Sequence, residues 1–365
     1  MAYNFALSSW LESIMVRHSP ISLLQQRFYR HYRLIHGVRL AFAFMVTLSL
    51  IRLIKLPNDA WSLVTMVVIL GPLPYWGNIV TRTWHRVLGT CVGAALGMVA
   101  LYLLGSLPWL GMIWCAAVMV ACGYVALGKR PYVGLLLGIT LAVIVGPHPS
   151  SMEAALWRAG DVLVGALIAI VLAAIWPHKA YLHWRMKLAS QLRATALLYR
   201  SALSPNLLAP PPLEGQRSRL MGELVKLRPL MAPAARESGA PLKGMEQIQR
   251  GLRNLVAQLE LLGSAFWANR ESHFALLGDE LLRRAHQRIG DLIDQLAQLA
   301  IDGQLSHDLL GELAQVEADL RGLLASGGRT PEVAGYLWLN LALIDQLRTL
   351  QRDLLGVLNH PGGAE

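Results

Sequence analysis

Two arginines and one aspartate are the residues of this sequence whose type and spacing could do chemistry inside an apolar environment. Arg86 and Arg158 each open a long apolar segment, and Asp161 follows Arg158 on the same helical face. A charge inside a membrane is costly, so it is commonly functional or neutralised by a partner. The two cations predict binding of an anion. Asp161 could carry a proton or could neutralise Arg158, and both interpretations stay open.

The two arginines occupy equivalent places in an internal repeat. Residues 64–72 read VTMVVILGP and residues 139–147 read ITLAVIVGP, with five of nine positions identical. Both copies end in Gly-Pro, which would free backbone groups to line a cavity. The repeated threonines could bind a substrate or could bond their own helix backbone. The residues assigned to a substrate pathway are Arg86, Arg158, Asp161, Thr65, Thr140, Gly71, Pro72, Gly146 and Pro147.

Small residues recur at intervals of four in the two segments that the arginines open. Gly89, Gly93 and Gly97 form two consecutive GxxxG steps, and Gly165 and Ala169 echo them in the later segment. Such spacing lets helix backbones approach closely in lipid. We expect these residues either to pack the third and sixth spans together within the chain or to form a dimer seam.

Six apolar segments of roughly membrane-spanning length must position these residues. The chain is 54% hydrophobic and 15% charged, which is too apolar for a soluble protein of 365 residues. The segments lie near 37–56, 60–80, 87–107, 109–127, 132–148 and 156–176, and TRTWHR at 81–86 reads as a loop. Three spans repeated once must be inverted relative to each other, so the pattern predicts the inverted 3+3 repeat that many secondary transporters share.

Positive charge predicts the orientation. Residues 1–176 hold 12 Lys or Arg and 4 Asp or Glu, while residues 177–365 hold 21 and 19. The cations flank alternate loops, and Lys179, Arg185 and Lys187 follow the sixth span, which places both termini in the cytoplasm. A nucleic-acid-binding protein would carry its basic residues on a soluble domain, so we expect no nucleic acid partner.

The second half of the chain is rich in leucine and charge and predicts a cytoplasmic helical bundle. The all-α organisation is therefore an N-terminal arm at 1–36, a transmembrane domain at 37–176 and a helical domain at 177–365. Helices are expected near 178–203, 241–269, 272–302, 304–326 and 331–358, with a Pro-rich break at 204–215. One apolar stripe of the bundle contains Ile248, Leu252, Leu255, Val256, Leu259, Leu262 and Phe266.

Motifs for catalysis and cofactors are not found. GYVALGKR at 123–130 approaches a phosphate-binding loop, but Arg130 stands where that motif needs Ser or Thr. There is no HExxH, GxSxG or CxxC, so we expect neither an enzyme nor a metal or cofactor site. The first 20 residues lack the basic start of a signal peptide.

Several stretches resemble a known family. WSLVTMVVILGP (61–72), WGNIV (76–80) and the pattern of Arg86, Gly89, Thr90, Gly93 and Ala94 resemble the membrane domain of the FUSC family, the fusaric acid resistance proteins and aromatic acid exporters. YRHYRLIHGVRLA (29–41), LGKRPY (127–132), ALWRAGD (155–161), SALSPNLL (201–208) and GYLWLN (335–340) are similar to its YeeA-type inner-membrane proteins. The resemblance implies a bacterial inner-membrane protein that exports small aromatic carboxylates or related anions.

The sequence is compatible with two functions. The first is a secondary transporter in which Arg86 and Arg158 bind the carboxylate and Asp161 takes the proton. Many FUSC pumps contain two membrane-plus-cytoplasmic units, whereas this chain contains one, so the resemblance implies a homodimer. Distantly similar plant malate transporters also work as dimers, and a periplasmic adaptor stays open as a further partner. The alternative is a non-transporting membrane scaffold whose cytoplasmic bundle binds another protein.

Overall fold

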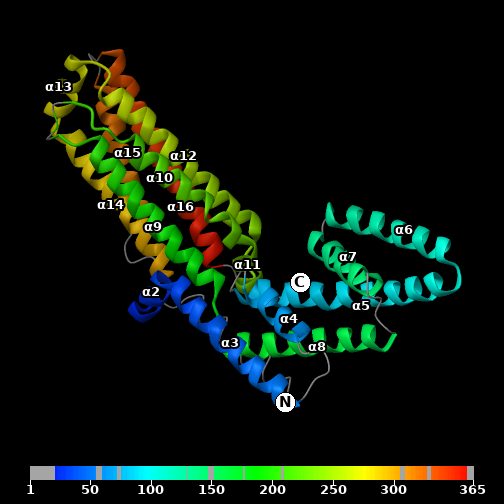
Figure 1. The fold of residues 1–365 in the computed structure, drawn as a ribbon. Helices are drawn as coiled ribbons and strands as arrows, with labels where there is room; N and C mark the ends of the chain where they lie inside the picture. The colour runs from blue at the N-terminus through cyan, green and yellow to red at the C-terminus, as the bar shows by residue number, and fades with distance from the viewer. Residues whose placement is uncertain are drawn as a thin grey trace. The chain divides into compact units, whose positions relative to one another are not determined.

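A computed structural model describes residues 21–54, 60–71, 75–128, 130–146, 152–175, 177–205, 207, 209–304, 309–326 and 330–359. Helices joined by turns and short connections make up these ranges, as the ribbon shows (Figure 1). The chain forms two compact units, one of residues Arg30–His178 and the other of Met1–Tyr29 with Lys179–Glu365. The described residues are therefore all-α, as the sequence predicts.

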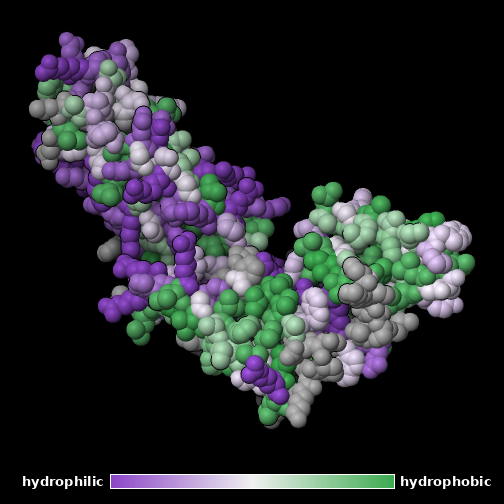
Figure 2. All heavy atoms as spheres, viewed as in Figure 1, coloured by the Kyte–Doolittle hydropathy of each residue, from purple (hydrophilic) through white to green (hydrophobic). Residues whose placement is uncertain are grey.

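The unit of Arg30–His178 contains the apolar helices. They are α3 (Tyr32–Ile54), α4 (Ala60–Leu70), α5 (Trp76–Ser106), α6 (Pro108–Ala126), α7 (Pro131–Val145) and α8 (Met152–Ile175). Proline opens α6 and α7, where its missing N–H costs no helical hydrogen bond. Apolar residues dominate the visible surface of these helices (Figure 2).

Four helices of the described ranges are long and apolar enough to cross a membrane: α3, α5, α6 and α8. The helices α4 and α7 are apolar but have only 11 and 15 residues. The predicted span at 60–80 is wrong in its extent, because α4 ends at Leu70 and Trp76 already begins α5. The predicted loop at 81–86 is also wrong. Those polar residues contain no helix breaker and lie inside α5, whose 31 residues extend about 46 Å.

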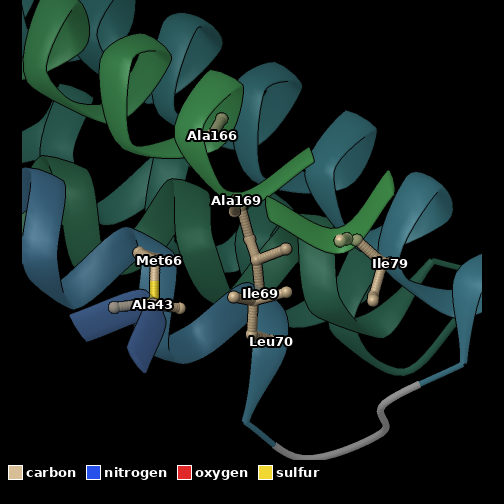
Figure 3. Packing of buried hydrophobic residues seen from close by; sticks show 8 residues of the cluster. Ala43, Met66, Ile69, Leu70, Ile79, Ala166 and Ala169 are labelled. Carbon is tan, nitrogen blue, oxygen red and sulfur yellow. The ribbon is translucent and has the colours of Figure 1, made fainter. Parts of the chain in front are cut away.

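Small and medium side chains fill the interior of this unit. One cluster joins Ala43 of α3, Met66, Ile69 and Leu70 of α4, Ile79 of α5, and Ala166, Ala169 and Ala173 of α8 (Figure 3). Larger apolar side chains point outward, among them Leu135, Leu163 and Leu167. Large apolar residues outside and small ones inside are typical of helices that pack in lipid.

The second unit is a bundle of helices from the C-terminal half, with one helix from the N-terminal segment. Its helices are α2 (Leu23–Arg30), α9 (Ala180–Ala202), α10 (Glu214–Val225), α11 (Arg228–Ser238), α12 (Leu242–Phe266), α13 (Arg270–Gly278), α14 (Glu280–Asp302), α15 (Leu309–Ala325) and α16 (Pro331–Leu358). The predicted stripe of α12 is confirmed as core, since every member is buried. The predicted helix at 272–302 is two helices, because Asp279 caps α14 by accepting a hydrogen bond from the Leu282 amide.

Arg185 shows how this bundle holds a charge in its interior. Its side chain is 0% exposed, and it donates hydrogen bonds from Nε to the Ala300 carbonyl at 2.9 Å and from Nη2 to the Ile301 carbonyl at 2.8 Å. These carbonyls belong to the last turn of α14, which favours a cation. Arg185 therefore caps the C-terminal end of α14 from inside the bundle.

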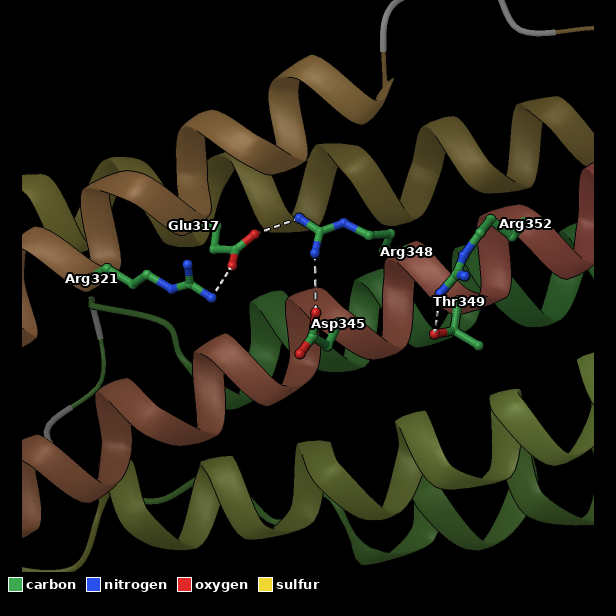
Figure 4. A network of polar contacts seen from close by, with 6 residues as sticks. All are labelled: Glu317, Arg321, Asp345, Arg348, Thr349 and Arg352. Carbon is green, nitrogen blue, oxygen red and sulfur yellow. Dashed lines mark hydrogen bonds and ion pairs between the residues drawn. The ribbon is translucent and has the colours of Figure 1, made fainter.

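An ion-pair network joins α15 to α16. Arg348 of α16 contacts Glu317 of α15 and donates to Asp345 at 3.1 Å, and Arg321 reaches the same Glu317 (Figure 4). The hydrogen bond from Arg348 lowers the pKa of Glu317. The network fixes the register of the two helices at their partly exposed edge.

Candidate functional site

Arg86 lies inside the unit of Arg30–His178, called the membrane unit below. It is surrounded there by residues of α4, α5 and α7. Its side chain, 5% exposed, extends from α5, and Nη2 donates to Thr65 Oγ1 of α4 at 3.3 Å. The hydroxyl of Tyr132, at the start of α7, lies beside the same guanidinium. A cation and two hydroxyl groups from three helices are thus brought together.

Arg158 of α8 reaches the same region and is also 5% exposed. Its Cζ lies 3.5 Å from the centroid of the Trp61 ring of α4, a close cation–π contact. Arg86 contacts Thr65 and Arg158 contacts Trp61, and these two partners lie about one turn apart on α4. The structure therefore brings the two arginines of the sequence repeat into one neighbourhood.

The two guanidinium groups keep unused hydrogen-bond donors. Arg86 Nε and Arg158 Nε and Nη1 are buried, and within the described ranges they have no hydrogen-bond partner. The guanidinium of Arg158 lies over Trp61. Asp161, three residues further along α8, is 1% exposed, and its backbone carbonyl accepts a hydrogen bond from Ser62 Oγ at 2.8 Å. Buried guanidinium groups with donors of this kind suit an anionic ligand.

The two repeated threonines differ in their bonds. Thr65 accepts the hydrogen bond of Arg86, whereas Thr140 Oγ1 donates to the Leu136 carbonyl of its own helix at 2.8 Å. Thr65 therefore belongs to the site, and the hydroxyl of Thr140 bonds its helix backbone, as one of the two interpretations expected.

The glycines let helices of this chain pack closely against one another. A Cβ at Gly93 would lie 2.8 Å from Thr140 Cβ and 3.0 Å from the Leu137 carbonyl of α7. A Cβ at Gly165 would lie 3.0 Å from Thr65 Cβ and 2.5 Å from the Ser62 carbonyl of α4.

Two further glycines of α5 make the same kind of contact. Gly89 and Gly97 face Leu136 and Ile144 of α7 in the same way, and Ala169 is buried in the core cluster. The glycine faces thus pack α5 on α7 and α8 on α4, whereas the sequence left open either packing of the third span on the sixth or a dimer seam.

The Gly-Pro breaks follow the two short helices. Gly71 and Gly146 lie directly after α4 and α7, where a Cβ would approach the carbonyl of Val67 or Ala142, respectively. The Gly71 carbonyl accepts a hydrogen bond from His36 at 3.0 Å. Pro72 and Pro147, which we assigned to the pathway, lie outside the described residues.

Sequence reasoning missed three residues of this region. Trp61 lies near the start of a predicted span, where a tryptophan is typical of the membrane interface. No pattern in the sequence singles out Tyr132 or Ser62. Trp61 and Thr65 are four residues apart and so share a helical face, which was a usable signal for Trp61. Tyr132 follows Pro131 at a helix start and carried no such signal.

Other polar groups of this unit already have partners. Arg39 of α3, also buried, contacts His178 Nδ1 at 2.7 Å. In the part of the chain that the structure describes, no three His, Cys, Asp or Glu side chains cluster as metal ligands would. The Arg86–Arg158 pair is therefore the arrangement best suited to bind a ligand.

Sequence comparison adds the family. Residues 33–361 match the fusaric acid resistance protein family. The chain belongs to this family. It is 44% identical over 340 residues to inner membrane protein YeeA of Escherichia coli K12, covering 90% of this chain and 96% of that protein. It is thus a multi-pass membrane protein related to an inner-membrane protein.

More distant relatives are much longer than this chain. Over 159 residues it is 25% identical to the p-hydroxybenzoic acid efflux pump subunit AaeB of Edwardsiella ictaluri. That match covers 39% of this chain and 24% of the pump subunit. An uncharacterized protein of Synechocystis, slr1298, is 28% identical over 144 residues, 38% of this chain and 18% of that protein. The chain thus matches about a quarter or less of these longer proteins.

Proposed function

We propose that this family member is a secondary transporter that exports a small organic or aromatic carboxylate across the inner membrane. The observation that carries the proposal is the buried pair of Arg86 and Arg158, whose charges repel each other and whose guanidinium groups retain free donors. A carboxylate between them would accept these hydrogen bonds and offset the repulsion. Arginine suits this task because its planar donor groups match a carboxylate.

The other side chains of the site fit the rest of such a ligand. Thr65 and Tyr132 offer hydroxyl groups beside Arg86, and Trp61 offers an aromatic face beside Arg158. An aromatic carboxylate could therefore bind through its charge and its ring together. This class agrees with the p-hydroxybenzoic acid named for the pump subunits. We assign Asp161, which is buried three residues from Arg158, as the proton carrier.

We further propose that the membrane domain, residues 37–176, is an inverted 3+3 repeat. The contacts of Gly93 and Gly165 support this arrangement, because their partners Leu137 and Thr140 stand 75 positions after Ser62 and Thr65. In this proposal α3, α4 and α5 correspond to α6, α7 and α8. The pathway then lies where the two repeats meet, which is where the arginines are.

The assembly around this domain is also part of the proposal. Residues 1–36 and 177–365 are cytoplasmic, as the distribution of Lys and Arg supports. Because one membrane-plus-cytoplasmic unit is present, we propose a homodimer as the transporting species. A periplasmic adaptor would extend the export path, as a partner of the dimer.

The test is flux through the purified protein in liposomes. We expect uptake of radiolabelled benzoate to follow an imposed pH gradient, and we expect Arg86→Ala and Arg158→Ala to abolish it. Arg52→Ala is the matched control, since Arg52 is an exposed arginine in the last turn of α3. Flux that persists in both site variants would overturn the assignment of the arginines. Absence of flux for several anions, with correct assembly demonstrated, would favour the scaffold instead.

A further inference from the structure

The cytoplasmic unit contains a cavity that the transport proposal does not use. Its volume is about 300 Å³, and it lies among α9, α12, α13 and α14 and the residues after α9. This volume is at the lower end of the range for small-molecule sites. We propose that this cavity is a second ligand site, which binds a compact organic monocarboxylate from the cytoplasm. The proposal does not rest on transport by the membrane unit.

Apolar and aromatic groups form much of the cavity wall. Leu203, Phe266 and Leu276 are buried, and each lines the cavity. The rings of Tyr199 and His286 lie nearly perpendicular, with centroids 6.2 Å apart, and Phe266 stands at the same distance from His286. Such a wall favours a ligand with an apolar or aromatic body, which can pack against ring edges.

Tyr199 contributes a buried aromatic ring to this wall. Its side chain is 1% exposed, and its hydroxyl is shielded from the cavity. Recognition of the ligand therefore comes from the rings of the wall and from the charge at the rim.

The charges at the rim include one cation that suits an anionic ligand. Arg200 is held by Asp291 at 2.9 Å and Asp294 at 2.6 Å, so its charge is neutralised and these three side chains together carry one net negative charge. Arg283 also lines the cavity and is exposed, and within the described ranges it forms no ion pair. It is therefore the cation available to a ligand's carboxylate.

His286 does not add to the positive charge of the site. It receives or donates a 2.7 Å hydrogen bond with the Tyr336 hydroxyl, and burial lowers its pKa to about 4. At neutral pH it is an uncharged ring of the wall. The single available guanidinium of Arg283 thus matches a ligand with one carboxylate.

The test is calorimetric titration of the full-length protein in detergent micelles with benzoate and with 4-hydroxybenzoate. We use the Arg86→Ala background, so that binding at the membrane site does not contribute heat. Arg283→Ala should weaken binding roughly tenfold, the effect of one lost charge-assisted hydrogen bond. Arg284→Ala is the control, because Arg284 is the next residue of α14 and pairs with Glu280.

Two more variants test the wall. Leu277→Trp should fill the cavity and abolish binding of both probes at an unchanged melting temperature. Tyr199→Phe should leave the affinity for both probes unchanged, because the hydroxyl is shielded from the cavity. Equal affinity in the Arg283 and Arg284 variants, binding that survives Leu277→Trp, or no heat with either probe at millimolar concentration would each overturn the proposal. Because liposome flux is a separate measurement, failure here leaves the transport proposal unaffected.

Discussion

The guanidinium of Arg158 lies flat enough on the Trp61 ring to bring Cζ within 3.5 Å of the ring centroid. The two residues come from α8 and α4, which lie far apart in sequence and pack together in the membrane unit. The aromatic face replaces part of the solvation that a buried cation lacks while leaving its donors Nε and Nη1 available. Trp61 is thus a positioning residue for Arg158.

We expect Trp61→Leu to raise the KM for benzoate flux by roughly tenfold or more, since a desolvated cation–π contact contributes about 2 kcal/mol. Trp61→Phe should recover much of the affinity because it restores an aromatic face. Concentration-dependent uptake into liposomes measures both. Trp84→Leu, at an exposed position of α5, is the control. An unchanged KM in Trp61→Leu would show that Arg158 needs no such support.

Helix packing predicts a sharp contrast between two glycines of α8. Gly165→Ala should destabilise the membrane unit by about 1–3 kcal/mol, because its Cβ would lie 2.5 Å from the Ser62 carbonyl. Gly160→Ala should leave the melting temperature unchanged or slightly raised, since nothing lies within 4 Å of a Cβ there. Thermal unfolding in detergent distinguishes them. Equal melting temperatures would contradict the close approach of α8 to α4.

The buried cap of α14 makes a prediction for the helical bundle that contains it. Arg185→Met should lower the free energy of unfolding by about 3 kcal/mol, because two charge-assisted hydrogen bonds to carbonyls are lost. Arg193→Met on the same helix α9 should cost under about 1 kcal/mol, since that side chain is exposed. Denaturant unfolding with a probe in α9 measures the difference. Similar losses for the two variants would rule out the capping role.

Stability of the helical bundle of residues 179–365 should fall in mild acid. Burial, together with the charge of Lys187, lowers the pKa of His183 to about 4, below its ordinary value near 6.5. The unfolded chain then binds the proton more readily, so the stability is complete above about pH 6.5 and is lost as the pH falls toward 4. The loss reaches about 3 kcal/mol. Melting temperatures at pH 7.5 and 4.5 measure it, and His183→Gln should reduce their difference. A variant with the original pH dependence would exclude His183 as the cause.

Hydrophobic periodicity is sufficient to predict a helix and its bounds where the helix keeps one face buried over many turns. The pattern of α16 predicted 331–358, the bounds that the structure has. The helices α10 and α11 escaped prediction because Pro-rich residues precede α10, and α11 contains Pro233 within it and a proline near its start. These residues look like a break in sequence, and only packing against α9 and α12 accounts for their helices.

The candidate site, like the fold, has a part that the sequence predicts and a part that it does not. The repeat was enough to single out Arg86 and Arg158, since equivalent positions in two copies are visible in one sequence. It could not reveal that Arg158 lies over Trp61, because a rotamer choice depends on what the neighbouring helix offers. Nor could it indicate that Thr65 contacts a guanidinium while Thr140 bonds its own backbone.

The neighbourhood of Arg86 and Arg158 has a mechanical consequence. Arg86 belongs to α5, which packs on α7 through glycines. Arg158 belongs to α8, which packs on α4 through Gly165. Repulsion between like charges therefore acts between these two pairs of helices and favours their separation. An anion held by both arginines, as we propose, would reverse the sign of that force. Ligand affinity and helix spacing would then be coupled reciprocally: whatever draws α5 and α8 together would tighten anion binding, and an anion that binds would draw them together.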